Sequence, residues 1–313
     1  MYTIKHLAQD FQVIEHIRPL KEGSTYQLCK LTKTDMPTID AILRIAKQLN
    51  IKESDIQFGG IKDRKAVTTQ YITLPHFVTP KRFSHEKIQL EHIGNTQERM
   101  HSKCIIENEF IIRIRNVQKD QITKKKTIIN TFGTQRFSKN NVEVAIALLQ
   151  RNFRQATHLI FSNQNQNRFE KKARERLEKE PTNYIQALKE LPQTQLKLYI
   201  SAYQSFIWNH IVQTLVKEKK PLPDFLPLIG FDIEQDSIFE TYIQPILERD
   251  RIDTRQFIFR EIPYLTAETI LRKTQVPLND FAILQEHDDG ITVTFKLPRG
   301  SYATEAIDQL LKK

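Results

Sequence analysis

Residues 57–74 read QFGGIKDRKAVTTQYITL, and this stretch decides the fold class. Its apolar side chains do not recur at the spacing of a helix face, and the pair Gly59-Gly60 would break a helix. The pattern predicts a strand that runs into a glycine turn, then an exposed basic loop, and then a second strand near residues 71–74. This part of the chain is therefore expected to form sheet.

Further helices and strands are expected on both sides of this segment. Residues 110–115 and 291–297 alternate apolar and polar side chains, which is the period of a half-buried strand. Residues 38–49, 142–149 and 196–211 carry apolar side chains at helical spacing. Because helices and strands occur without regular alternation, the chain is expected to adopt an α+β fold with a largely antiparallel sheet.

Length and composition exclude several classes of protein. The 313 residues suggest about two domains. Two cysteines, Cys29 and Cys104, are too few for a disulfide framework or a four-ligand zinc site. No apolar run approaches the roughly 20 residues that span a bilayer, and the first residues lack the apolar core of a signal peptide. We therefore expect a cytoplasmic protein with no membrane partner.

The charge of the chain suggests a polyanionic partner. Lys and Arg number 47 against 37 for Asp and Glu, so the formal charge is 47 − 37 = +10. Nucleic acid is the simplest partner for such a protein, although many proteins are basic without any specific partner. The polar stretch from about residue 153 to 190 carries charges of both signs and is interpreted as a solvated helix face.

Several cofactor motifs are missing from the sequence. It contains no GxGxxG, no GxxxxGK[ST] and no GxSxG. His85, His92 and His101 are too irregularly spaced for a helical pair of metal ligands. If the chain is an enzyme, we expect a reaction without cofactor or metal; a Ser-His-Asp triad stays open.

Glycine is scarce, with 8 residues in 313, and four of these lie in three polar, basic windows. The windows are GGIKDRK with Gly59 and Gly60, FGTQRF with Gly133, and LPRGSYAT with Gly300. Such positions are expected to need a positive φ or a close backbone approach. The nearby cations that would contact phosphate are Lys62, Arg64, Lys65, Arg136 and Arg299. Three ordinary surface turns with solvated cations are the simpler alternative.

Asp63 is the candidate for chemistry in the first window. Its neighbours Lys62 and Arg64 favour the charged form of its carboxyl group. An ionised aspartate suits nucleophilic or base chemistry at a sugar carbon. Aspartate is also common in turns for purely structural reasons, so both roles remain open on these residues alone.

At four windows in order, the chain resembles the TruD family of tRNA pseudouridine synthases. GGIKDRKAVTTQ resembles the loop that holds the family's catalytic aspartate, here Asp63. NTFGTQRF resembles its N-x-F-G-x-Q-R-F motif, and FKLPRGSYAT resembles its C-terminal strand and turn. Lys5 lies ahead of Asp10 at a spacing similar to that of the family's basic residue ahead of its D-F-x-V-x-E segment.

The resemblance implies that uridine is isomerised to pseudouridine in tRNA, at uridine 13 of the D arm. The N1–C1′ bond breaks, the uracil turns while bound, and C5 bonds to C1′. This reaction needs one carboxylate near the ribose, Asp63, and no cofactor or metal. Whether that carboxylate attacks C1′ or removes a ribose proton stays open, and a monomer is the default expectation.

The resemblance also implies roles for residues around the catalytic carboxylate. Lys5 would pair with it and keep it ionised. Phe132 would stack on the flipped uracil, with a core aromatic as the alternative. Asn130 would order its loop or contact the base or the carboxylate, while Gln135 and Arg136 would support the site or bind phosphate.

The implied architecture has two domains. Residues 1–155 and 265–313 would form a catalytic domain with a central mixed, mostly antiparallel sheet, and residues 156–264 an inserted α/β domain, called TRUD in the family. RNA would lie in a cleft between them, lined by Lys and Arg. Two other functions stay open: a non-catalytic RNA-binding or RNA-chaperone protein of the same fold, and another RNA-modifying enzyme such as a methyltransferase. The missing glycine-rich cofactor loop counts against the methyltransferase.

Overall fold

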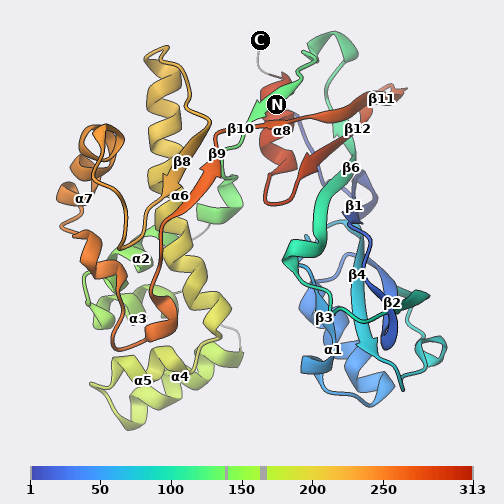
Figure 1. Cartoon of the computed structure of the whole chain (residues 1–313), viewed down its shortest axis with the longest axis horizontal. Coiled ribbons are helices and arrows are strands. Elements are labelled where there is room, and N and C mark those ends of the chain that lie inside the picture. Colours follow the sequence, from blue (N-terminus) through green and yellow to red (C-terminus); the bar gives the residue numbers. More distant parts are fainter. Residues whose placement is uncertain (1, 138–139, 163–167, 312–313) are drawn as a thin grey trace. The chain divides into compact units, whose positions relative to one another are not determined.

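The computed structural model of the chain describes residues 2–137, 140–162 and 168–311. The chain divides into two compact units (Figure 1). The first combines Met1–Ile128 with Val276–Lys313, the blue and red ends of the colour scale, and the second comprises Ile129–Gln275. Each unit is described separately below.

The first unit is built on a mixed sheet of eight strands in the order β11-β12-β6-β1-β4-β2-β5, with β3 paired to β4. Within this sheet β1 and β4 are parallel neighbours, and the other pairings are antiparallel. The expected α+β class with a mixed, mostly antiparallel sheet is therefore confirmed. The strands are β1 Phe11–Ile17, β2 Glu22–Thr34, β3 Gln57–Phe58, β4 Val67–Pro75, β5 Ile88–Thr96, β6 Ile105–Arg115, β11 Asn279–His287 and β12 Gly290–Pro298.

The C-terminal strand β12 lies in the same sheet as the N-terminal strands. In β12, Phe295 lies opposite Phe110 of β6, and Val293 lies opposite Ile112. Strand β6 pairs in turn with β1, where Val13 faces Phe110. The alternating apolar side chains of these strands share one face, because paired residues point to the same side of a sheet.

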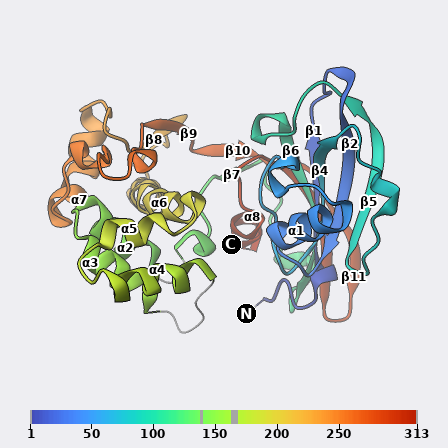
Figure 2. The ribbon, with the colours of Figure 1, turned by 90° about the horizontal axis from the view of Figure 1, so that it is seen from below.

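Two helices cover this face of the sheet (Figure 2). Helix α1, Thr38–Leu49, buries Ala41 and Ile45 and packs on residues of β2 and β4. It coincides with the predicted helix and ends where Asn50 adopts a left-handed conformation with φ of 54°. Helix α8, Ala303–Leu311, packs on β6 and β12 in a second apolar cluster.

Polar side chains occupy the same face between these two apolar clusters. Lys33, Thr68 and Val13 lie side by side on β2, β4 and β1, in register across the three strands. Lys33, Thr68, Gln70 and Glu15 are all buried, with no exposed surface. Buried polar groups require partners, and Lys33, Gln70 and Glu15 find theirs in the loop that contains Asp63.

The second unit is mainly helical. Its longest helix, α6, is buried on several sides and carries Tyr203 and Trp208 in its core. A short antiparallel pair, β8 with β9, lies beside the helices, and β7 with β10 joins the two ends of this segment. The remaining bounds are α2 Asn141–Leu149, α3 Phe153–Phe161, α4 Arg168–Lys179, α5 Tyr184–Lys189, α6 Gln193–Lys217, α7 Gln244–Arg249, β7 Thr127–Ile129, β8 Phe225–Leu228, β9 Ile270–Lys273 and β10 Gln275–Pro277.

The two units divide at positions that differ from the expected domain borders. The sequence placed these borders after residues 155 and 264, whereas the compact units change over after Ile128 and Gln275. Residues 129–155 join the second unit because α2 packs against α6. Strand β9 likewise pairs with β8 in that unit. The assignment of the units as catalytic and inserted domains stays a prediction.

The polar stretch near residues 153–190 forms three helices, although residues 163–167 within it lie outside the described part. Helix α4 buries Glu170 and Ala173 and exposes most of its other side chains, in agreement with the interpretation as a solvated helix face. Across the described residues, none of the helices combines the length and the apolar character that a membrane crossing requires.

Candidate active site

Asp63 lies in the loop of residues 59–66, at the edge where the two parallel strands begin. Lys5 precedes β1 and Asp63 precedes β4, and the register places Gln12 of β1 beside Val67 of β4. Adjacent parallel strands start at the same edge of a sheet, so their preceding segments meet there. This topology brings Lys5 and Asp63 together although they are far apart in the sequence.

The carboxylate of Asp63 is paired and accessible. Its Oδ1 atom lies 3.0 Å from Lys5 Nζ, and the exposed fractions of the Asp63 and Lys5 side chains are 28% and 22%. Lys5 adopts a positive φ of 57°, a conformation that non-glycine residues rarely take. Its ammonium also lies 4.1 Å from the centre of the Phe11 ring. The expected pairing of Lys5 with Asp63 is thus present.

Buried side chains hold the backbone of this loop from beneath. Lys33 Nζ donates to the Asp63 carbonyl oxygen at 2.7 Å. The backbone N–H of Lys62 donates to Thr38 Oγ1 at 3.0 Å, and Gln70 Nε2 donates to the Gly60 carbonyl at 3.2 Å. The donors and acceptors come from β2, the start of α1 and β4, so the loop is bound to two strands of the sheet and to the helix that covers them.

The glycines of the basic windows behave differently from one another. A Cβ atom on Gly59 would lie 2.5 Å from Ile105 Cδ1, so this glycine allows a close approach. Gly300 has a φ of 81°, which favours glycine. The expectation is wrong for Gly60, because its φ is not positive and a Cβ atom there would meet nothing within 4 Å.

The predicted RNA contact of Lys62 does not match its environment in the structure. Its Nζ atom lies 2.6 Å from Glu15 Oε2, and its side chain is 10% exposed against 0% for Glu15. Lys62 also donates to Asn108 Oδ1 at 2.8 Å. The ammonium therefore neutralises a buried carboxylate instead of facing a phosphate.

The other predicted cations of this unit are exposed. Arg64 and Lys65 follow Asp63 on the loop and lie on the surface. Arg299 is also exposed, and its Nη1 atom donates to the Ser102 carbonyl at 2.8 Å. These three side chains therefore have the accessibility that a phosphate contact needs.

Lys33 carries the clearest electrostatic perturbation near Asp63. Burial lowers the pKa of its ammonium from 10.5 to about 8. The negative charge of Asp63 opposes this shift, and the positive charge of Lys62 adds to it. The neutral form of Lys33 is therefore expected to become the major one only above about pH 8.

Phe132 belongs to the second unit and is not the exposed stacking platform that the motif suggested. Its ring is 5% exposed and packs edge-on against Trp208, with ring centres 5.7 Å apart. The Arg272 guanidinium lies 4.0 Å from the ring centre. Asn209 fixes the Phe132 backbone with two hydrogen bonds of 2.9 Å, one to the N–H and one to the carbonyl. A nucleobase that approached the Arg272 side would meet the guanidinium first.

Asn130 orders the chain beside Phe132. Its Oδ1 atom accepts from Arg272 Nη2 at 2.7 Å, and its Nδ2 atom donates to the Lys273 carbonyl at 3.1 Å. Of its predicted roles, loop ordering matches these contacts. Asp63 lies in the other compact unit.

Gln135 and Arg136 lie in a short 3₁₀ turn, Thr134–Phe137, of the second unit. Gln135 is exposed, and the Arg136 guanidinium lies 5.5 Å from the centre of the Phe132 ring. The Arg136 carbonyl accepts from Asn141 Nδ2 at 3.0 Å, which connects the turn to α2. Arg136 thus packs beside Phe132 and connects its turn to α2.

A family model described as tRNA pseudouridine synthase D (TruD) matches residues 2–168, 162–227 and 220–309. The chain belongs to this family. The resemblance seen in the four sequence windows and the enzyme class that it implied, a tRNA pseudouridine synthase, are thus confirmed.

Curated members of the TruD family align over almost the whole chain. The tRNA pseudouridine synthase D of Leptospira interrogans is 24% identical over 393 aligned residues, which cover 99% of this chain and 96% of that protein. The tRNA pseudouridine synthase D of Geobacter metallireducens is 25% identical over 389 residues, with coverages of 99% and 95%. A crystal structure from Methanosarcina mazei assigned to TruD is 19% identical with a TM-score of 0.68, covers 99% of this chain and 93% of the other, and shows the same fold.

Several residues that contact the Asp63 loop or Phe132 had no role predicted from the sequence, although Glu15 and Gln70 lie within the quoted motifs. Thr38, Gln70, Glu15 and Lys33 support the Asp63 loop, and Arg272 covers Phe132. A signal was present for Lys33, since it lies in phase with the apolar residues of its strand, where a charged side chain is unusual. Arg272 has no comparable signal.

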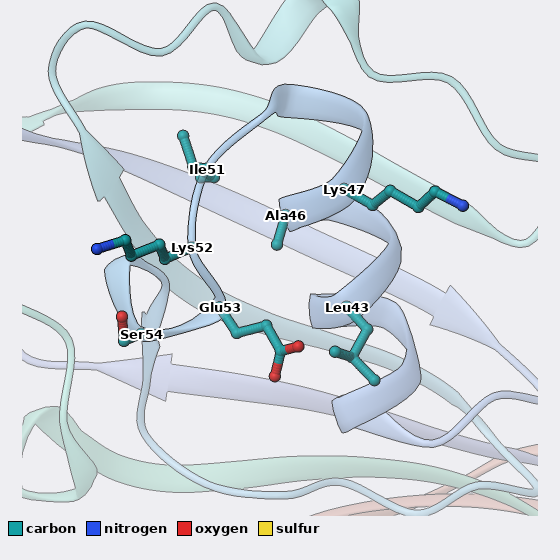
Figure 3. A pocket seen from close by; sticks show the side chains of 7 residues that line it. All are labelled: Leu43, Ala46, Lys47, Ile51, Lys52, Glu53 and Ser54. Carbon is teal, nitrogen blue, oxygen red and sulfur yellow. The ribbon is translucent and has the colours of Figure 1, made fainter.

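No cluster of three or more metal-binding side chains occurs in residues 2–137, 140–162 and 168–311. An open pocket of about 720 Å³ lies at the C-terminal end of α1 (Figure 3). Its lining residues include none of the predicted site residues; they are Leu43, Ala46, Lys47, Ile51, Lys52, Glu53 and Ser54.

Proposed function

We propose that this synthase converts uridine 13 in the D arm of tRNA to pseudouridine, with Asp63 as the catalytic residue and without a cofactor or metal. The observation that carries the proposal is the partly exposed Asp63 carboxylate, paired with Lys5 at 3.0 Å on a loop whose backbone is bound by buried side chains. A fixed, ionised carboxylate that a ribose can reach is the one group this reaction requires.

The proposed reaction is an isomerisation. The N1–C1′ bond of the uridine breaks, the uracil turns, and C5 bonds to C1′. The C5 hydrogen leaves to solvent and N1 gains a proton, so no oxidant, reductant or group donor is consumed. Lys5 holds the Asp63 carboxylate for either of two tasks, attack on C1′ or removal of a ribose proton.

The proposed substrate is an everted nucleotide within a polyanionic RNA. Exposed Arg64 and Lys65 would contact phosphates beside the target uridine. The planar Arg272 guanidinium, which covers Phe132, offers a stacking surface for a base in place of the phenyl ring. We further propose that the synthase acts in the cytoplasm as a monomer.

Tritium release tests the catalytic assignment. The purified protein is incubated with a tRNA transcript that carries tritium at C5 of uridine. We expect the wild type to release tritium, and Asp63→Asn to lose this activity while its affinity for tRNA stays within about threefold. Asp120→Asn, an exposed aspartate of the same unit, serves as the matched control and should turn over normally.

Two results would contradict the proposal. Normal turnover by Asp63→Asn would remove Asp63 from the chemistry. Salt-sensitive tRNA binding by the wild type without tritium release would favour the non-catalytic RNA-binding function. Mapping pseudouridine in cellular RNA with and without the protein then tests position 13.

A further inference from the structure

Lys33 is a fully buried lysine whose ammonium contacts the loop of residues 59–66. It lies on β2 in phase with Cys29 and Leu31, which belong to the apolar cluster beneath α1. Its side chain has no exposed surface, and its Nζ atom donates to the Asp63 carbonyl oxygen at 2.7 Å.

The charged groups around Lys33 come from the loop itself. Asp63 favours its charged form and Lys62 opposes it. Each of these is already paired, Asp63 with Lys5 and Lys62 with Glu15. The neighbouring position on β4 is the uncharged Thr68, and the partner on β5 is Ile88. Lys33 therefore has no carboxylate partner of its own among these neighbours.

A buried ammonium is an unfavourable choice for stability alone. Apolar residues of similar size often replace buried charges without loss of stability. The hydrogen bond of Lys33 reaches the backbone of the residue that carries the chemistry, and perturbed groups cluster at functional sites. The position of Lys33 thus indicates that its role is to hold the loop that carries Asp63.

We propose that Lys33 is a positioning residue of the synthase, which fixes the backbone of Asp63 and supplies a second positive charge beneath its carboxylate. The proposal rests on the proposed function of Asp63. Lys5 binds the carboxylate from the surface and Lys33 binds the carbonyl from within, so the aspartate is held at both ends.

The substitution Lys33→Met tests this role. It keeps an unbranched side chain of similar size and removes the charge and the hydrogen bond. We expect kcat for tritium release to fall at least tenfold, while KM for the tRNA transcript stays within twofold. Lys30→Met is the matched control, because Lys30 is half-buried on the opposite face of the same strand. It should leave kcat and KM unchanged.

The pH profile separates positioning from a merely structural role. Because burial lowers the pKa of Lys33 to about 8, we expect wild-type kcat to fall as the pH rises through this value. Lys33→Met should lack this alkaline limb at its lower rate, and Lys33→Arg, which keeps its charge, should move the limb to higher pH. The Lys33→Arg result decides the question if the methionine variant fails to fold.

A wild-type kcat in a folded Lys33→Met, or an alkaline limb that neither variant changes, would overturn this inference. Asp63→Asn, measured in parallel, distinguishes the two proposals. If Asp63→Asn is inactive and Lys33→Met is normal, only the role of Lys33 fails. If Asp63→Asn turns over normally, the proposed function fails first.

Discussion

Asp63 and Lys33 are linked by two opposing physical demands at the scale of single residues. The Asp63 carboxylate is partly exposed and paired with Lys5, whereas the Lys33 ammonium is buried where its charge is unfavourable. The hydrogen bond of 2.7 Å from Lys33 to the Asp63 carbonyl connects the two. A lysine that only neutralised Asp63 would bind its carboxylate, as Lys5 does.

The buried ammonium of Lys33 predicts a rise of stability with pH. Its pKa is about 8 in the folded protein and 10.5 ordinarily, so the unfolded chain binds more protons between these values. The free energy of unfolding should therefore increase by about 2–3 kcal/mol between pH 8 and 10 from this group. Urea denaturation of the wild type and Lys33→Met over this range measures the difference.

The tyrosines of the chain do not disturb this comparison, because both proteins contain them. Lys33→Met should show no corresponding rise, so the free energy of unfolding of the wild type should increase relative to that of the variant as the pH increases. Parallel curves for the two proteins would show that Lys33 stays fully charged in the folded state up to pH 10.

At the scale of elements, the order of the strands assembles the site. Lys5, Asp63 and Lys33 flank the starts of β1 and β4 and the end of β2, which meet at one edge of the sheet. Between the apolar clusters under α1 and α8, the sheet face carries polar side chains, and the loop of residues 59–66 covers them. The backbone of this loop is held in place by hydrogen bonds from these buried side chains.

The ion pair between Lys62 and Glu15 predicts a strong effect on stability. Lys62→Met would leave the fully buried Glu15 carboxylate without its cation. We expect the free energy of unfolding to fall by about 3–5 kcal/mol, measured by chemical denaturation. Adding Glu15→Gln to Lys62→Met should restore most of this loss, since the unpaired charge is removed.

The neighbouring cation provides the control for this prediction. Lys65 is exposed on the same loop, so Lys65→Met should change the free energy of unfolding by no more than about 0.5 kcal/mol. If Lys62→Met and Lys65→Met lowered the free energy of unfolding equally, the buried ion pair between Lys62 and Glu15 would make no specific contribution to stability.

At the scale of the whole molecule, the residues that the motifs singled out are divided between two compact units. Lys5, Lys62 and Asp63 belong to the first unit, whereas Asn130 and Phe132 belong to the second. Each unit has its own core, with aromatic packing around Trp208 in the second. The family motifs therefore fall in both compact units.

The net charge of +10 predicts salt-dependent binding of tRNA. The logarithm of the affinity should fall linearly with the logarithm of the salt concentration. The double variant Arg64→Gln/Lys65→Gln should reduce this slope by about 1–2. Filter binding or fluorescence anisotropy at several salt concentrations measures the slope.

The matched control removes two charges elsewhere in the same unit. Lys47 and Lys52 line the pocket at the end of α1 (Figure 3). Lys47→Gln/Lys52→Gln should leave the slope nearly unchanged. If both double variants lower the slope equally, the RNA contact is not local to the loop that carries Asp63.

The sequence by itself determined the local elements and the family. The periodicity of residues 38–49 and 291–297 predicted α1 and β12, because side-chain spacing reports which face of an element is buried. The four motif windows likewise identified the family, since the residues within each window are close together in the chain. These features depend on neighbours along the sequence.

Only the tertiary structure decided how the side chains are used. Lys62 became the partner of Glu15 and Phe132 became buried, because strand order and helix packing choose neighbours that are distant in sequence. Helix α2 joined the second unit for the same reason. The position of Lys33 in phase with its apolar neighbours hinted at burial, but the parallel pairing of β1 and β4 was needed to place it under the loop that Lys5 also holds.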